Sequence, residues 1–213
     1  MDFTLARTNM VKSQVVPNSI ENPELISSLM KIEREIFVDE EFRSYAYSDY
    51  SIPLVGERRF LKPLQLSWMI QSLELNTGDK VLVIGAGTGY EAALLANMGM
   101  KVFALESDAA LTKKGEALTT GIEWRTGDLS QGWADESPFD GIMICGAVPE
   151  IPNKAIGQLS KSGNLVTVVG NAGDVVMHAM RVVGLSGGDR AETLFETVAF
   201  PLPDFVDSSR FEL

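Results

Sequence analysis

Three closely spaced glycines are the first residues in this sequence whose types and spacing suggest chemistry. The stretch Gly85-Ala86-Gly87-Thr88-Gly89 follows the apolar residues 81–84 and precedes a helical pattern. Glycines in this position let the backbone turn tightly and approach a nucleotide-like ligand. A dinucleotide-binding loop places its third glycine one residue later, where this chain has Tyr90. The loop is therefore less suited to a pyrophosphate, and a purely structural glycine turn has the same composition.

Two acidic positions follow the glycine loop at the offsets that a nucleoside site requires. Glu106 ends the next apolar run roughly 20 residues after the first glycine, where a carboxylate accepts hydrogen bonds from ribose hydroxyls. Gly127-Asp128 follows the third run, at the edge that would face the adenine of such a ligand. Each alone is also typical of an ordinary strand end or turn. Together with the loop, they predict a nucleoside-binding site on three consecutive β-α units.

The glycine loop needs a strand before it and a helix after it, and the sequence repeats this alternation. Apolar runs predict strands at 80–85, 101–106, 122–128, 139–147 and 164–170, with helices at 90–99, 109–118 and 154–159. Such alternation implies right-handed crossovers and a parallel sheet. Two further runs, 174–184 and 192–200, leave no room for a helix and should pair antiparallel. The predicted fold class is α/β, a Rossmann-like, doubly wound, mostly parallel sheet with a C-terminal antiparallel hairpin.

Residues 1–75 have a different pattern, and we expect an N-terminal helical extension that carries a substrate loop. Apolar residues at helical spacing predict a helix over 24–37, which Asn22-Pro23 would start. A second helix is predicted over 63–73, with Pro63 in its first turn. Residues 76–213 would then form the core, and the two parts together one compact domain.

The composition excludes several kinds of site and partner. Cys145 is the only cysteine and the chain has one histidine, so neither a disulfide nor a Cys/His zinc centre is available, and no metal is predicted. The net charge of −11 argues against general nucleic-acid binding. Because no apolar run reaches signal-peptide or membrane-spanning length, we expect a soluble, cytoplasmic protein without a membrane partner. The oligomeric state is left open.

Longer stretches of the sequence resemble the protein-L-isoaspartate (D-aspartate) O-methyltransferase family, from about residue 7 to residue 203. The segment IEREIFVDEEFRSYAYSDYSIPL at 32–54 is similar to that family's N-terminal signature, which other methyltransferases lack. VLVIGAGTGYEAALLA at 81–96 resembles its first cofactor motif, and ALESD at 104–108 its ribose-binding strand end. GDLSQGW at 127–133 resembles its adenine-side segment. The later strands at 139–152 and 159–170 are similar as well.

This resemblance implies a class I methyltransferase fold and the cofactor S-adenosyl-L-methionine. It also implies a substrate, a protein or peptide with an isoaspartyl residue whose methylation serves protein repair. The residues expected to bind the cofactor follow the three motifs. They are Gly85, Ala86, Gly87, Gly89, Glu106, Ser107, Gly127, Asp128 and Leu129.

Two positions depart from the pattern of that family. Its substrate loop usually reads Gln-Thr-Ile-Ser-x-Pro, with hydroxyls beside the methyl-accepting carboxylate. Here Leu61 stands at the serine position, so no catalytic residue is assigned, and the loop carries Arg58, Arg59 and Lys62. Because guanidinium groups bind carboxylates in a forked geometry, the three cations are candidate substrate-binding residues, although a solvated basic loop has the same composition. Val83 replaces an acidic residue common in the first strand of the family.

The leading hypothesis is methyl transfer to an isoaspartyl carboxylate, which needs positioning and desolvation but no general base, because the nucleophile is already ionised at neutral pH. Two alternatives follow from the altered loop. One is a family member that binds S-adenosylmethionine without this activity, as a sensor or interaction module. The other is a methyltransferase retargeted to a small acidic acceptor. An NAD(P)-dependent oxidoreductase is a more distant alternative, because the glycine spacing and the C-terminal hairpin do not favour it.

Overall fold

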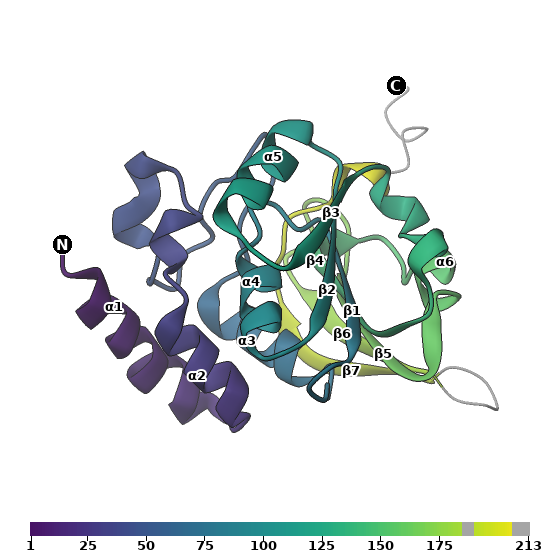
Figure 1. The fold of residues 1–213 in the computed structure, drawn as a ribbon, viewed down its shortest axis with the longest axis horizontal. Helices are drawn as coiled ribbons and strands as arrows, with labels where there is room; N and C mark the ends of the chain where they lie inside the picture. The colour runs from purple at the N-terminus through teal and green to yellow at the C-terminus, as the bar shows by residue number, and fades with distance from the viewer. Residues whose placement is uncertain (185–189, 206–213) are drawn as a thin grey trace.

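The computed structural model describes residues 1–184 and 190–205, and it contains a seven-stranded sheet (Figure 1). The strand order is β3-β2-β1-β4-β5-β6-β7. Strands β1 to β5 run parallel, while β6 is antiparallel to β5 and β7 antiparallel to β6. The bounds are β1 Lys80–Ile84, β2 Lys101–Glu106, β3 Ile122–Thr126, β4 Phe139–Val148, β5 Leu159–Val169, β6 Met177–Val183 and β7 Arg190–Thr197. The predicted fold class is confirmed.

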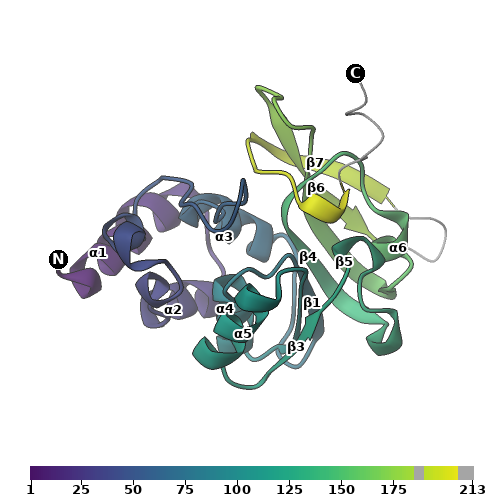
Figure 2. The ribbon, with the colours of Figure 1, turned by 90° about the horizontal axis from the view of Figure 1, so that it is seen from above.

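Helices cover both faces of this sheet, as the turned view shows (Figure 2). Helices α3 (Pro63–Gln71), α4 (Tyr90–Asn97) and α5 (Ala109–Leu118) lie on one face, and the short α6 (Asn153–Ile156) lies on the other. Helices α1 (Phe3–Met10) and α2 (Pro23–Lys31) form an outer layer beyond α3 and α4.

Alternate residues of the central strands pack into two separate hydrophobic clusters, one on each face of the sheet. Val81 and Val83 of β1 belong to the cluster under α3 and α4, while Leu82 and Ile84 belong to the cluster on the α6 side. All four are fully buried, because a central parallel strand is covered on both faces. The first cluster also includes residues of α1 and α2, from which we infer that the predicted extension and core fold as one unit.

The predicted helix over 24–37 is wrong in its second half, because α2 ends at Lys31. Ile32 leaves the helix with an extended backbone (φ −77°, ψ 124°), and a single 3-10 turn follows at Arg34–Ile36. The cause is tertiary. The side chain of Arg34 is completely buried, and its Nη2 donates to the carbonyl oxygen of Leu61, 2.7 Å away. This contact holds Arg34 in the 3-10 turn, so packing overrides the helical spacing.

Smaller differences concern the ends of elements. Helix α6 ends at Ile156 instead of 159, and β5 begins at Leu159 because that residue already pairs with Phe139 of β4. The hairpin strands form as expected, while residues 185–189 of the predicted turn lie outside the described residues. Within residues 1–184 and 190–205, no helix is long and apolar enough to cross a membrane. The same described residues contain no cluster of His, Cys, Asp and Glu able to hold a metal ion.

Candidate active site

The glycine loop connects β1 to α4 at the carboxyl edge of the sheet. Gly85, Gly87 and Gly89 all have positive φ, at 72°, 59° and 95°, which other residues rarely adopt. The amides of Gly85 and Ala86 donate to the carbonyl oxygen of Leu105, at 2.9 and 3.1 Å. These bonds hold the loop against the end of β2, so the next acidic residue of that strand reaches the loop.

That acidic residue, Glu106, is fully buried at the end of β2. Its Oε2 accepts from the amide of Gly87 at 2.7 Å, and its Oε1 accepts from the amide of Asp108 at 3.0 Å. The hydroxyl of Ser107 lies 3.4 Å from Oε1. The structure therefore brings together Gly85, Gly87, Glu106 and Ser107 as the sequence predicts.

Arg58 completes the surroundings of Glu106. Its Nη1 lies 2.5 Å from Oε1 and its Nη2 lies 2.8 Å from Oε2, a two-pronged ion pair. Nη2 also donates to the carbonyl oxygen of Gly85 at 3.2 Å. Only 8% of Arg58 is exposed. The residue expected to face a substrate thus points into the interior, at the position expected for a cofactor.

Apolar side chains fill the space beside this ion pair. A Cβ atom on Gly87 would lie 3.0 Å from Leu54, and one on Gly85 would lie 3.0 Å from Leu202. The cavity left between the loop and the Arg58 segment is about 10 Å³. One water molecule needs about 10–15 Å³ of such volume. In this conformation the site therefore does not fit S-adenosylmethionine.

The adenine-side segment lies after β3 and contacts the end of the described chain. Asp128 is exposed and caps a short 3-10 turn at Leu129–Gln131. A hydrogen bond from the Ser130 hydroxyl holds the pKa of the Asp128 carboxyl below its usual value. Leu129 is buried, and its amide donates to Oδ2 of Asp204 at 2.8 Å. The segment 200–204 reaches this position because Phe200 and Leu202 exchange backbone hydrogen bonds with Ala147 of β4. Gly127 leads into this turn.

Arg59 and Lys62 line an open cleft of about 690 Å³ that Arg58 does not line, and Arg59 also borders the small cavity beside Arg58. The guanidinium of Arg59 stacks on the ring of Phe200, 4.8 Å from its centroid. Lys62 forms an ion pair with Asp49 at 3.5 Å. The cleft is also lined by the β7 residues Glu196 and Thr197. The structure therefore places two of the three predicted cations together and separates the third.

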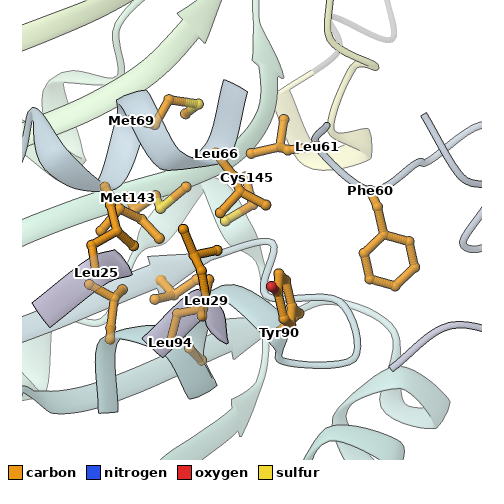
Figure 3. Packing of buried hydrophobic residues seen from close by; sticks show 14 of the residues in the cluster. Leu25, Leu29, Phe60, Leu61, Leu66, Met69, Tyr90, Leu94, Met143 and Cys145 are labelled. Atoms are coloured by element: carbon orange, nitrogen blue, oxygen red, sulfur yellow. The ribbon is translucent and has the colours of Figure 1, made fainter. Parts of the chain in front are cut away.

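Leu61 packs inward beside Leu66 and Cys145, as Figure 3 shows. It is 4% exposed, so the position of the family serine is here part of the hydrophobic core. Cys145 is buried as well, and burial raises the pKa of its thiol well above the usual value. Glu91 lines the cavity of about 10 Å³ between the glycine loop and the Arg58 segment. It is also buried, and desolvation raises the pKa of its carboxyl.

A buried arginine beside the glycine loop was missed by the sequence-based site assignment. The guanidinium of Arg34 lies over the rings of Tyr90 and Phe60, at 4.7 and 5.4 Å from their centroids. Burial raises the pKa of the Tyr90 hydroxyl to about 12. The available signal was the similarity of residues 32–54 to the family signature, which includes a basic residue at this position.

An open, mostly parallel sheet, a glycine loop after β1 and a buried acid ending β2 define a doubly wound α/β protein of the methyltransferase class. The chain belongs to the protein-L-isoaspartate(D-aspartate) O-methyltransferase family, whose sequence model matches residues 6–200. This confirms the resemblance found in the sequence. The enzymes of this family transfer a methyl group from S-adenosylmethionine.

Similar proteins agree with this assignment over most of the chain. A protein-L-isoaspartate O-methyltransferase of Syntrophotalea carbinolica is 35% identical over 182 residues, which cover 83% of this chain and 84% of the relative. A solved protein-L-isoaspartate O-methyltransferase matches with a TM-score of 0.81 at 20% identity, covering 93% of this chain and 67% of its own. A related protein from Plasmodium falciparum, solved with S-adenosyl-L-homocysteine, has a TM-score of 0.77 at 14% identity and covers 96% of this chain and 99% of its own. At these identities the two structures support the fold alone.

Proposed function

We propose that this protein is an S-adenosylmethionine-dependent O-methyltransferase that methylates the carboxylate of isoaspartyl residues in proteins or peptides, and so serves protein repair. The observation that carries this proposal is membership of the family over residues 6–200, with a relative of that name matched over 84% of its length. The glycine loop and the buried Glu106 support the cofactor assignment. A cytoplasmic location and the absence of a nucleic-acid partner remain part of the proposal, the latter supported by the net charge of −11.

The residues proposed for the cofactor line the carboxyl edge of β1 to β3. Gly85, Ala86, Gly87 and Gly89 would provide close backbone approach, and Glu106 with Ser107 would accept and donate hydrogen bonds at the ribose. Gly127, Asp128 and Leu129 would border the adenine. These assignments describe an open form of the site, because the conformation described here leaves only about 10 Å³.

Arg59 and Lys62 are proposed to hold the acceptor in the open cleft. The cleft of about 690 Å³ is large enough for a few peptide residues, and it lies along β7 at the edge of the sheet. Both cations would attract the acidic groups of an isoaspartyl peptide, while Asp49 and Glu196 in the same lining balance their charge, so the acceptor carboxylate would compete with Asp49 for Lys62. Their role is to bind and orient a carboxylate that is already ionised, so no general base is needed.

Two specific observations favour alternative functions. Leu61 is buried where the family has a hydroxyl, and the cofactor cleft is filled by side chains of the chain itself. Both fit a family member that binds the cofactor only after rearrangement and works as a sensor or interaction module. The half-buried cations Arg59 and Lys62 of the open cleft equally fit a methyltransferase retargeted to a small acidic acceptor.

A methyl-transfer assay separates these functions. Purified protein is incubated with labelled S-adenosylmethionine and, in parallel, an isoaspartyl peptide, its normal aspartyl counterpart and a small dicarboxylic acid. The proposal expects label on the isoaspartyl peptide alone. Label on the small acid alone would support retargeting, and no label on any acceptor, with folded protein, would support the non-catalytic alternative.

A further inference from the structure

The carboxylate of Glu106 has no acceptor capacity left for a ribose. Its Oε1 accepts from Arg58 and from the amide of Asp108, and its Oε2 accepts from Arg58 and from the amide of Gly87, so four donors remain even when the Ser107 hydroxyl, 3.4 Å from Oε1, rotates away. A carboxylate offers about four lone-pair sites. A ribose hydroxyl that donates to Glu106 must therefore displace one of these donors.

The two backbone donors cannot leave without breaking the fold. The amide of Gly87 belongs to a loop held by β2, and the amide of Asp108 directly precedes α5, which Asp108 caps through Ala110 and Leu111. Arg58 is the donor that can move. It approaches Glu106 from residues 53–59, a segment 48 residues distant in sequence with no strand or helix of its own.

The segment that carries Arg58 is a small turn on the surface. Leu54 and Arg58 are joined by a backbone hydrogen bond of 3.0 Å, and a single bridge pairs Pro53 with Arg59. Val55, at the tip, is 40% exposed, and Gly56 adopts φ 56°. The base of the turn is held by the backbone hydrogen bond from Phe60 to Ile52 and by the stacking of Arg59 on Phe200, while Leu54 and the Arg58 side chain fasten its middle. Because it belongs to no helix or strand, it can open locally more readily than a strand.

We propose that the Arg58 guanidinium occupies the ribose subsite and must leave Glu106 before the cofactor binds. The competition between Arg58 and the ribose thereby sets the apparent cofactor affinity. This inference rests on the proposed function only in taking a nucleoside cofactor as the ligand. The guanidinium pairs with the buried carboxylate while the site is closed, and the Leu54 side chain then packs against Gly87. Apparent affinity falls in proportion to the fraction of molecules that are open, so removing the internal competitor strengthens binding.

The test measures binding of S-adenosylhomocysteine by calorimetry to wild type and to Arg58→Gln. Glutamine restores the residue that the family carries here, and it can still donate one hydrogen bond to Glu106. We expect the dissociation constant to fall on the order of tenfold or more. Arg43→Gln is the matched control, because Arg43 is exposed outside the cleft and the same charge is lost. It should bind like wild type.

A second variant keeps the test valid if Arg58→Gln unfolds. Arg58→Lys keeps the charge but loses the forked geometry, so its affinity should lie between wild type and the glutamine variant. Equal or weaker binding by both variants, or no binding by any folded variant, would overturn the proposal. Methyl transfer to an isoaspartyl peptide is recorded in parallel. Stronger binding without methylation would refute the proposed function alone, and methylation without an affinity change would refute this inference alone.

Discussion

The carboxylate of Asp204 accepts a hydrogen bond of 2.8 Å from the amide of Leu129, 75 residues earlier in the chain. This contact fastens the C-terminal segment 200–204 over the turn that follows β3. It also occupies a backbone donor beside the proposed adenine position. Two segments far apart in the sequence, one carrying Arg58 and one carrying Leu202 and Asp204, therefore close the same site.

Removing the Asp204 contact should loosen this closure. Asp204→Asn weakens a charge-assisted hydrogen bond that is partly exposed, so we expect a loss of about 0.5–1.5 kcal/mol in the free energy of unfolding. Urea unfolding measures the loss, with the exposed Glu123→Gln of β3 as a charge-matched control expected to change little. Unchanged stability in Asp204→Asn would show that the contact does not hold the segment.

The ion pair between Arg58 and Glu106 should appear as an energetic coupling. Breaking a buried pair from one side typically costs about 3–5 kcal/mol, and we expect the lower end because Glu106 keeps two backbone donors. In a cycle of Arg58→Gln, Glu106→Gln and the double variant, the coupling free energy should be about 0.5–3 kcal/mol. Urea unfolding of wild type and the three variants measures the coupling. If the stability losses of the two single variants simply add up in the double variant, the two side chains do not interact energetically.

Glu91 should make stability depend on pH. Desolvation raises the pKa of its carboxyl, and this effect outweighs the positive charges of Arg34 and Arg58, which lower the pKa. Between the ordinary glutamate pKa of about 4.3 and the raised folded value, the folded state binds more protons than the unfolded state. The free energy of unfolding therefore loses a contribution as pH rises through this window.

Glu91→Gln has no carboxyl to titrate at this position, so its stability can be compared with that of wild type at each pH. The free energy of unfolding of the variant minus that of wild type should increase as pH rises above about 4.3 and should level off once Glu91 is ionised. Urea unfolding from pH 4 to pH 8 measures the difference. A difference that is flat or that decreases with pH would show that the Glu91 carboxyl is not destabilised by burial.

The two cations of the open cleft should contribute to acceptor binding. Arg59→Ala together with Lys62→Ala should raise KM for an acidic acceptor while leaving kcat and cofactor affinity nearly unchanged, because the lost interaction is uniform binding. Added salt should raise KM of wild type more than that of the double variant, because both side chains are partly solvated. Steady-state kinetics at two ionic strengths give both quantities. If the double variant keeps the KM and the salt dependence of wild type, Arg59 and Lys62 do not bind the acceptor and belong only to the solvated surface.

Much of the fold could be predicted because it depends on local pattern. The fully buried run Val81–Ile84 indicates a central strand, and the three glycines that follow adopt the positive φ that their type permits. The order of strands and the antiparallel hairpin followed from the spacing of such runs. The end of α2 did not, because it depends on where Arg34 finds its partners, Leu61 and Tyr90, far along the sequence.

The site was predictable only in part for the same reason. The spacing of Glu106 from the glycine loop is a local property, whereas its pairing with Arg58 joins two segments with no shared pattern. Three neighbouring cations in sequence suggested one shared role for Arg58, Arg59 and Lys62. Arg58 is buried against Glu106 whereas Arg59 lines the open cleft, so neighbouring positions in this loop have different surroundings that their shared charge does not reveal.

The most direct test of the central claim is a competition between two acceptors in one reaction. Wild-type protein and S-adenosylmethionine are mixed with equal amounts of an isoaspartyl peptide and its aspartyl counterpart, and mass spectrometry follows both. The proposed function expects one methyl group, labile in base, to appear on the isoaspartyl peptide and none on its counterpart. Equal methylation of both peptides, or no methylation by folded protein at saturating cofactor, would contradict it.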